Sequence, residues 1–391
     1  MTSSIEMQLN PYPWYAQMQA ANPVVFSPSH DAYLVFGYEE VRQVFRDYQT
    51  FSSAVYHGLS EKLADAFENQ LQGIDPPRHT KLRALVSHAF TQREIAELEP
   101  NFRAIAEQLA DEMMKRQDPD FVRDFAVPYP IAVIAEMIGI PEEDLERFKY
   151  WSDVIVEISH RLLTGAEELP EHGNIFLEMS SYFEALIVER RRNPKNDLAS
   201  RLAVAEIEGA RLSDFDAANF CLILLVAGNE TTTNLLANAV RTFAEHPDQW
   251  QLLRSNPSLV PQAIEEVLRF RAPVQLMMRV ATQDAVVGGT TIEAGKRVIL
   301  FMGAANRDPK KFDDPDTFTI TRTASPHTSF GHGIHTCLGA PLARLESAIA
   351  LEVLLQRVEQ IRIAPTGDAL QPLTAFNLLG LKRLALDFSN G

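Results

Sequence analysis

The chain has 391 residues, 46% of them hydrophobic, so it can bury a large core, and global disorder is excluded. A formal net charge of −16 argues against nucleic-acid binding. Two cysteines, Cys221 and Cys337, cannot form a disulfide framework and suit a reducing, cytoplasmic setting. The N-terminal residues lack a signal-peptide pattern, and the longest apolar run, 220–228, is too short for a membrane anchor.

Helical periodicity dominates the first 250 residues. The exception is 24–36, which has the pattern of a β-hairpin. Helices are expected over five ranges, which are 76–90, 93–116, 128–138, 142–163 and 175–192. The longest helical pattern begins near Ser213, a suitable N-cap, and ends before Pro247.

The second part of the chain mixes helices with short strands. Helices are expected over 262–270 and 337–357, a β-hairpin over 285–301 and a last strand pair within 360–388. The stretch 307–330 is predicted to be irregular, and an irregular stretch of that length usually has a functional or tethering reason. Without repeats or linkers, the pattern predicts one mainly α domain over 1–391 with small β pieces.

The stretch "FGHGIHTCLG", 330–339, places Cys337 among glycines and histidines, ahead of a strongly helical run. A thiol at a helix N-terminus is stabilised as a thiolate, which acts as a nucleophile or as a metal ligand. A nucleophile would use a nearby base such as His332 or His335. A zinc site needs several ligands, whereas a haem iron takes a single thiolate.

This stretch resembles the haem-binding loop of the cytochromes P-450. The matching positions are Phe330, Gly333, His335, Cys337 and Gly339. The resemblance implies that Cys337 is the ligand of the haem iron. It covers nearly the whole chain and is closest to soluble bacterial members of the family.

A second matching motif is "AGNETT", 227–232, which puts polar side chains in the middle of an apolar helix. Buried polar groups are costly unless they are paired or functional. In the family this helix lies above the haem, so Ala227 and Gly228 are expected beside the cofactor. Glu230 would be the acid and Thr231 the alcohol that deliver protons during catalysis.

Further motifs imply structural and cofactor-binding roles. In "EEVLRF", Glu266 and Arg269 are three residues apart on one helix face, and in the family a later arginine, here Arg322, joins this pair. The haem propionates need cationic or hydrogen-bonding partners. The positions that match the family's propionate-binding groups are His79, Arg83, Arg279 and His335.

The resemblance implies a cytochrome P-450 fold, a triangular helical domain with small β-sheets and a long central helix over the haem. It implies a monooxygenase that carries haem b (iron protoporphyrin IX) and hydroxylates a small lipophilic substrate, such as a fatty acid, terpenoid or steroid. The sequence has no flavin or iron–sulfur motif and no fused reductase is expected. Electrons would come from a ferredoxin or flavodoxin with its NAD(P)H-dependent reductase, docking near Cys337 and using residues such as Arg344.

An apolar substrate pocket is expected from the long helix and from later segments. Its candidate lining residues are Val226, Ala227, Val274, Leu276, Met277, Phe376 and Leu378, with 52–73 and 160–175 as lids. Three alternatives remain: a peroxide-driven peroxygenase, a non-catalytic haem sensor, and a haem-free thiol enzyme. Glu230 and Thr231 argue against the first, because that branch of the family typically carries Arg-Pro there.

Overall fold

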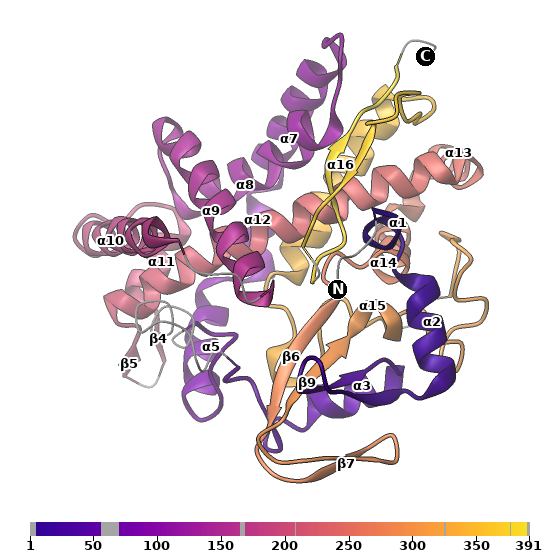
Figure 1. The fold of residues 1–391 in the computed structure, drawn as a ribbon. Coiled ribbons are helices and arrows are strands. Elements are labelled where there is room, and N and C mark those ends of the chain that lie inside the picture. The colour runs from indigo at the N-terminus through magenta and orange to yellow at the C-terminus, as the bar shows by residue number, and fades with distance from the viewer. Residues whose placement is uncertain are drawn as a thin grey trace. The chain divides into compact units, whose positions relative to one another are not determined.

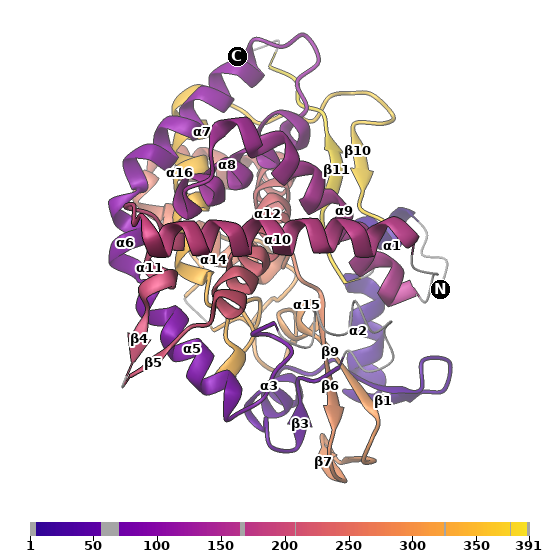
Figure 2. The same ribbon diagram turned by 90° about the vertical axis from the view of Figure 1, so that its left-hand side faces the viewer.

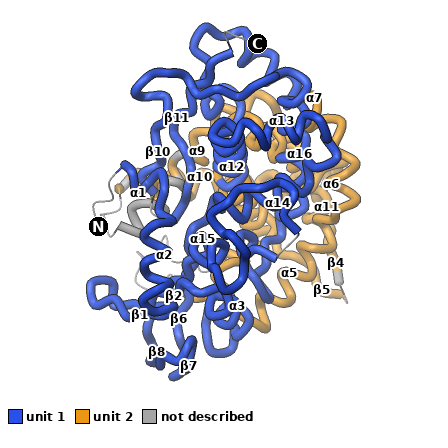
Figure 3. Tube along the Cα trace, turned by 90° about the vertical axis from the view of Figure 1, so that its right-hand side faces the viewer, with its two compact units in different colours: residues 1–52, 106–127, 231–391 blue, residues 53–105, 128–230 orange. Residues whose placement is uncertain are grey.

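The computed structural model describes residues 5–55, 70–164, 169–207, 209–323, 326–375 and 377–388. The chain forms two compact units (Figure 3). Unit 1 consists of 1–52, 106–127 and 231–391, and unit 2 of 53–105 and 128–230. Because each unit draws on separate parts of the chain, neither is a simple N- or C-terminal half.

Unit 1 combines helices with most of the strands (Figure 1). Its helices are α1 (Ile5–Leu9), α2 (Tyr12–Ala21), α3 (Tyr38–Arg46), α13 (Pro247–Ser255), α14 (Val260–Phe270), α15 (Met302–Ala305) and α16 (Ala340–Arg357), with the π-helical turn η1 (Val122–Ala126) and the 3₁₀ turns η3 (Pro257–Leu259) and η4 (Gly333–His335). Its main sheet has the order β1-β2-β9-β6-β3. These strands are β1 (Val24–Ser27), β2 (Ala32–Val35), β9 (Arg297–Phe301), β6 (Leu276–Ala281) and β3 (Phe51–Ser52).

The main sheet is buried on both faces, which explains why β2 and β9 are almost continuously apolar. Successive side chains on a strand point to opposite faces. Val35 and Val298 accordingly pack with the apolar side of α3, whereas Leu34 and Phe301 pack with Tyr15 of α2. The sheet therefore holds α2 and α3 on its two sides.

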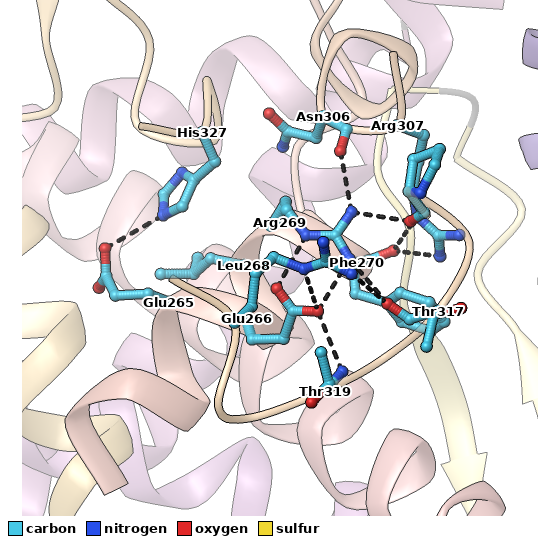
Figure 4. Close-up of polar contacts among 12 residues, drawn as sticks. Glu265, Glu266, Leu268, Arg269, Phe270, Asn306, Arg307, Thr317, Thr319 and His327 are labelled. Carbon is cyan, nitrogen blue, oxygen red and sulfur yellow. Dashed lines mark hydrogen bonds and ion pairs between the residues drawn. The ribbon is translucent and has the colours of Figure 1, made fainter. Parts of the chain in front are cut away.

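A buried ion-pair network orders the irregular stretch of unit 1 (Figure 4). The Arg269 guanidinium donates to both carboxylate oxygens of Glu266, each at 2.8 Å, and Arg322 donates to Glu266 Oε1 at 3.1 Å. The two guanidinium groups also donate to backbone carbonyls, those of Asn306, Asp313, Asp314, Pro315 and Thr317. These two arginines thus supply hydrogen-bond donors to backbone carbonyls of a segment that has no helix or strand to satisfy them. The prediction that Arg322 joins the pair of Glu266 and Arg269 is confirmed.

Unit 2 is mainly helical (Figure 2). It contains α5 (Arg78–Ala89), α6 (Gln92–Glu97), α8 (Pro128–Ile138), the 3₁₀ turn η2 (Glu142–Asp144), α9 (Leu145–Thr164), α10 (Pro170–Arg192), α11 (Leu198–Val204) and the small hairpin β4 (Glu206–Ile207) and β5 (Ala210–Arg211). The rings of Phe148, Trp151 and Phe183 pack together where α9 meets α10. Arg190 of α10 joins α8 and α11 by donating to the Gly139 carbonyl and to Asp197.

Two long helices contribute to both units. They are α7 (Glu99–Met114) and α12 (Asp214–Glu245). Ser213 caps α12 as predicted, since its hydroxyl accepts from the Asp216 backbone N–H at 3.0 Å. Among the described residues, α12 is the one helix long and apolar enough to cross a bilayer, and 72% of its most apolar window is buried in the protein. That burial is typical of a core helix.

Most of the predicted helices are confirmed with small shifts in their ends, but three predictions need correction. The helix expected over 93–116 is interrupted at Leu98, where α6 ends and α7 begins. Pro100 explains the break, because a proline cannot continue the backbone hydrogen bonding of α6. The last helix begins at Ala340 rather than at Cys337, with Pro341 in its first turn.

The third correction concerns 285–301, which does not form one hairpin. Only β7 (Ala285–Val287) and β8 (Thr290–Ile292) form a hairpin. The following β9 pairs in parallel with β2 and antiparallel with β6, a strand that the sequence analysis did not predict. The hairpin at 24–36 is confirmed by β1 and β2, and the late pair by β10 (Leu370–Pro372) and β11 (Leu381–Leu384). The described part of 307–330 contains no helix or strand, as expected.

Candidate functional site

The loop 330–339 in unit 1 presents Cys337 at its end. The thiol is exposed and precedes α16 by three residues. The Cys337 backbone N–H donates to the Phe330 carbonyl at 2.8 Å, which closes the loop on itself. His335 lies in η4, and the Thr336 hydroxyl donates to the Gly333 carbonyl at 2.8 Å. The sulfur therefore sits in a hydrogen-bonded loop immediately before the helix.

Gly333 allows this loop to lie against the end of α3. It has φ +77°, and a Cβ atom there would be 2.7 Å from the Phe45 carbonyl oxygen. Glycine is required for both reasons, the left-handed backbone and the close approach. The buried Arg279 of β6 lies over the ring of the same Phe45 at 5.3 Å and donates to the Met278 carbonyl. Phe45, which the sequence analysis missed, thus contacts both the loop and Arg279.

A second cluster, formed by Glu265, His327 and Arg344, supports the loop. Arg344 of α16 donates to both oxygens of Glu265, at 2.6 and 2.9 Å, and its guanidinium lies 4.5 Å from the Phe330 ring. His327 lies 3.2 Å from Glu265 (Figure 4). Burial alone would raise the pKa of Glu265, but Arg344 and His327 outweigh it and lower this pKa to about 2.

Sequence reasoning gave Arg344 a different role, that of a docking residue for an electron donor. Its guanidinium is paired with Glu265, and its role in docking remains a prediction. The sequence signal for this cluster was the pair Glu265–Glu266 in "EEVLRF", of which only the second glutamate was interpreted. The first glutamate holds the Cys337 loop to α14 through Arg344.

The predicted acid and alcohol lie on one stripe of α12. Ala227 is exposed and Glu230 and Thr231 are half-buried, whereas most of the helix is buried. Residues three and four apart share a helix face, so this small residue and these polar residues face the same side. Their neighbour Asn229 points elsewhere and donates to the Ser152 hydroxyl of α9 at 2.6 Å.

Gly228 has a packing role that the sequence analysis did not foresee. A Cβ atom at this position would lie 2.9 Å from Ile134 Cδ1 of α8. Glycine here allows α12 and α8 to approach within unit 2. A contact between Gly228 and a cofactor remains a prediction.

Two of the four predicted propionate-binding residues, His79 and Arg83, lie on α5 in unit 2. His79 is 1% exposed. Its pKa is lowered, first by burial and then by the charge of Arg83, while Asp75 opposes this shift. The histidine and arginine are therefore close enough to interact, as their spacing predicted. Arg279 and His335, the other two, lie in unit 1.

The expected pocket-lining residues have mixed outcomes. Leu276 is 4% exposed and packs with Tyr15 and Phe301 in the core beneath α2, so its assignment to the substrate pocket is wrong. Val274 and Met277 pack partly against the core on the α3 side. Phe376 lies outside the described residues, as do 56–69 and 165–168 within the expected lids.

The donor set of the loop fits a haem iron better than an ordinary metal centre. Within the described ranges, no group of three or more His, Cys, Asp or Glu side chains could hold a metal ion. A structural or catalytic zinc would need such a group. A haem iron can be held by a single protein thiolate, and Cys337 is an exposed thiol with Gly339 beside its sulfur. The residues present therefore fit a haem.

Comparison with known proteins agrees with this chemistry. The family described as "Cytochrome P450" matches residues 8–373. A "Putative cytochrome P450 YjiB" of Bacillus subtilis (strain 168) is 42% identical over 365 residues, covering 92% of this chain and 91% of the relative. The structure of CYP109E1 from Bacillus megaterium in complex with testosterone is 37% identical, with a TM-score of 0.87, covering 96% of this chain and 99% of its own.

A third similar structure is P450BioI in complex with an acyl carrier protein ligated to hexadec-9Z-enoic acid. It is 35% identical, with a TM-score of 0.90, and the match covers 98% of this chain and 100% of that one. The chain belongs to the cytochrome P450 family. It has the cytochrome P450 fold and is an oxidoreductase of the monooxygenase class, whose cofactor is a haem.

The lowered pKa of Glu265 makes the contribution of Arg344 to stability pH-dependent. The folded-state pKa lies below the ordinary value of 4.5, so this contribution is present above about pH 4.5 and is lost as the pH falls toward about 2. Arg344→Ala should therefore lower the free energy of unfolding at about pH 6, and this difference from wild type should shrink toward about pH 3. Urea denaturation across that range measures it.

The matched control is Arg93→Ala, which breaks an ion pair whose side chains are 88% and 60% exposed. That variant should change stability by at most about 1 kcal/mol. An Arg344→Ala effect that stays constant with pH would contradict the coupling between Arg344 and Glu265.

Proposed function

We propose that Cys337 binds the iron of haem b and that the two units together form a single haem domain over 1–391. The observation that supports this most directly is the exposed Cys337 thiol at the end of a loop anchored to α3 and α14. His79, Arg83, Arg279 and His335 would bind the propionates. Arg279 is a suitable partner, because a guanidinium held against an aromatic ring is both fixed and cationic.

The bound haem supplies the activation of dioxygen, and the chain supplies binding, geometry and protons. In a monooxygenation, one oxygen atom enters the substrate and the other leaves as water, with two electrons and two protons consumed. We assign the proton delivery to Glu230 and Thr231, which lie on one stripe of α12. The carboxyl can take up protons from solvent, and the hydroxyl can hold and pass them on at the site of reaction.

The substrate that we propose is small and lipophilic, of the steroid or fatty-acyl class. Two similar proteins support this class, one bound to testosterone and the other to an acyl chain carried by a protein. Val226 and Ala227 of α12, on the stripe of Glu230, would contact such a substrate. Titration of the haem-loaded protein with steroids and with fatty acids tests this substrate class. The readout is the spin-state shift in the haem absorption spectrum.

The electron donor that we propose is a small acidic protein, a ferredoxin or flavodoxin served by an NAD(P)H-dependent reductase. The basic patch of unit 1, defined as Arg42, Arg46 and Lys311, suits such a partner. Arg42 and Lys311 lie 5.4 and 5.1 Å from the Tyr38 ring, and Arg42 reaches His332 of the Cys337 loop. The pKa of His332 is lowered, first by burial and then by the charges of Arg42 and Arg46.

A peroxide-driven activity is the second candidate, because a haem–thiolate protein can also use peroxide. Glu230 and Thr231 favour the donor-dependent reaction. Peroxide already carries the protons that the reaction needs, so a peroxide-driven reaction depends less on a pair of residues that delivers protons. Comparing product formation with donor plus dioxygen against peroxide alone separates the two. Product formation only with peroxide would overturn the proposal.

Glu230→Gln should lower the donor-driven rate of product formation by about 10²-fold, because the amide cannot deliver a proton. The loss should be accompanied by a larger solvent isotope effect. Thr231→Ala should divert electrons from product to peroxide, whereas Thr231→Ser keeps a hydroxyl and should retain most of the product yield. A wild-type rate and yield in both Glu230→Gln and Thr231→Ala would contradict the assigned roles.

Arg42→Glu and Arg46→Glu should each slow reduction of the haem by the donor by about tenfold at low salt, because electrostatic steering raises association rates. The difference from wild type should shrink at high salt, where charges are screened. Lys382→Glu, on β11 and away from α3 in Figures 2 and 3, is the matched control and should have little effect. Equal slowing by all three variants would count against a local docking surface.

A further inference from the structure

A cavity of about 460 Å³ lies in unit 1 and is separate from the Cys337 loop. Its lining residues come from α2, from the N-terminal end of α3 and from the stretch 307–316. The Cys337 loop contacts the opposite end of α3, at Phe45, and this helix of 9 residues spans about 13 Å. Pockets for small ligands commonly have volumes of about 300–1,000 Å³, so the cavity is large enough for a small molecule.

Arg307 supplies a buried cation to the cavity. It is 8% exposed, and its guanidinium packs on the rings of Tyr12 and Phe270, 4.1 and 3.6 Å from their centres. Its Nε and Nη2 atoms donate to the Phe270 carbonyl (Figure 4), and Nη1 donates to Asp316 at 2.7 Å. A guanidinium has five N–H groups, so one N–H on each terminal nitrogen has no partner among the described residues. Two such donors suit a carboxylate.

The charge of Arg307 is only partly compensated in the protein. Burial lowers its pKa to about 10, Tyr12 opposes this shift, and the charge of Arg269 adds to it. The carboxylate of Asp316, its ion-pair partner, is 75% exposed and therefore screened by solvent. An anion bound inside the cavity would stabilise this guanidinium further.

Glu40 of α3 supplies the opposite charge. It is half-buried and lines the same cavity. Gly37, the N-cap of α3, makes room for the carboxylate, because a Cβ atom at that position would collide with Glu40 Oε2. In the part of the chain that the structure describes, Glu40 has neither a hydrogen bond nor an ion pair. The cavity therefore presents a carboxylate that can accept hydrogen bonds from a ligand.

The remaining charged groups of the lining are Asp308 and Lys310. Both oxygens of Asp308 are engaged, since they accept from the backbone N–H groups of Tyr38 and Lys310 at 2.8 and 2.9 Å. The side chain of Lys310 is exposed and makes no hydrogen bond or ion pair with any other described residue. Its ammonium group can therefore join Arg307 in binding an anion.

The rest of the lining is largely apolar, and one buried polar atom lacks a partner. Small apolar residues contribute from three segments, namely Ala16, Ala20, Pro23, Pro309 and Pro315. Tyr12 is 7% exposed, and its hydroxyl has no hydrogen-bond partner within the described ranges. A buried polar group without a partner often marks a place where a ligand or water completes the structure.

We propose that this cavity binds a small zwitterion, whose carboxylate is held by Arg307 and Lys310, whose ammonium group is held by Glu40, and whose apolar body packs on the alanines and prolines. An amino acid is the simplest molecule of this kind. A simple anion would be repelled by Glu40, and a simple amine by Arg307 and Lys310, so the lining discriminates against both. The site lies outside the haem chemistry proposed above and does not depend on it.

The ligand class is tested by calorimetric titration of the haem-loaded protein with leucine, phenylalanine and ε-aminocaproate. Each is compared with the analogues that lack its amino or its carboxyl group, which for leucine are isocaproate and isoamylamine. At least one zwitterion should bind at least about tenfold more tightly than both of its analogues, the effect of one charge-assisted hydrogen bond. Binding should leave the haem absorption spectrum unchanged.

Three results of these titrations would overturn the proposal. They are no binding by any of the three zwitterions, equally tight binding by a singly charged analogue, and binding that shifts the haem spectrum. The last result would place the ligand at the haem instead of in the cavity.

The location is tested with Ala16→Trp, which puts a large ring into the cavity from an exposed position on α2. This variant should abolish binding of the zwitterion. The matched control is Gln17→Trp, which adds the same ring at the next exposed position of α2, outside the cavity lining, and should bind as wild type does. Both variants should keep the haem and the wild-type melting temperature. Binding that persists in Ala16→Trp, or is lost equally in both, would contradict the location.

The roles of the two charges are tested with Glu40→Gln and Lys310→Gln, neither of which breaks a side-chain contact between described residues. Glu40→Gln should weaken binding of the zwitterion by about tenfold but should not weaken isocaproate, because the amide no longer repels an anion. Lys310→Gln should weaken the zwitterion and isocaproate alike. Wild-type affinity for the zwitterion in both variants would overturn the assigned contacts.

Discussion

The ion pairs of the Glu266 carboxylate order the irregular stretch that leads to the Cys337 thiol. This carboxylate binds two guanidinium groups, Arg269 and Arg322, and these in turn satisfy the carbonyls of an irregular stretch that ends in the Cys337 loop. A segment without helix or strand cannot rely on a regular hydrogen-bond ladder, so it needs side chains to order it. The neighbouring Glu265 continues this arrangement to Arg344, directly against the loop. Helix α14 thus supports the stretch that leads to Cys337.

Much of the architecture could be predicted from the sequence, and the failures have specific causes. Glycine and cysteine spacing identified the loop, and the resemblance to the cytochromes P-450 identified Arg322 as the residue that joins Glu266 and Arg269. The parallel pairing of β2 with β9 was missed because the partners are 265 positions apart, and periodicity is a local signal. The contact of Gly228 with Ile134 of another helix was missed, because packing between two helices is not visible in the pattern of one helix.

The helices α12 and α16 each have a polar side chain that is placed by a hydrogen bond to a partner outside the helix. In α12 the Thr233 hydroxyl donates to the Ala126 carbonyl. In α16 the guanidinium of Arg344 is taken up by Glu265. Such satisfied polar contacts cost little and restrict motion, because breaking one leaves a buried group without its partner.

The central claim is that the Cys337 thiolate binds the haem iron, and the spectrum of the reduced protein with carbon monoxide tests it most directly. Wild type should show the red-shifted Soret band of a thiolate-ligated iron, and Cys337→Ser should lose it. Cys221→Ser is the matched control, because that thiol is fully buried in α12 and burial raises its pKa. Retention of the band in Cys337→Ser, or its loss only in Cys221→Ser, would contradict the account.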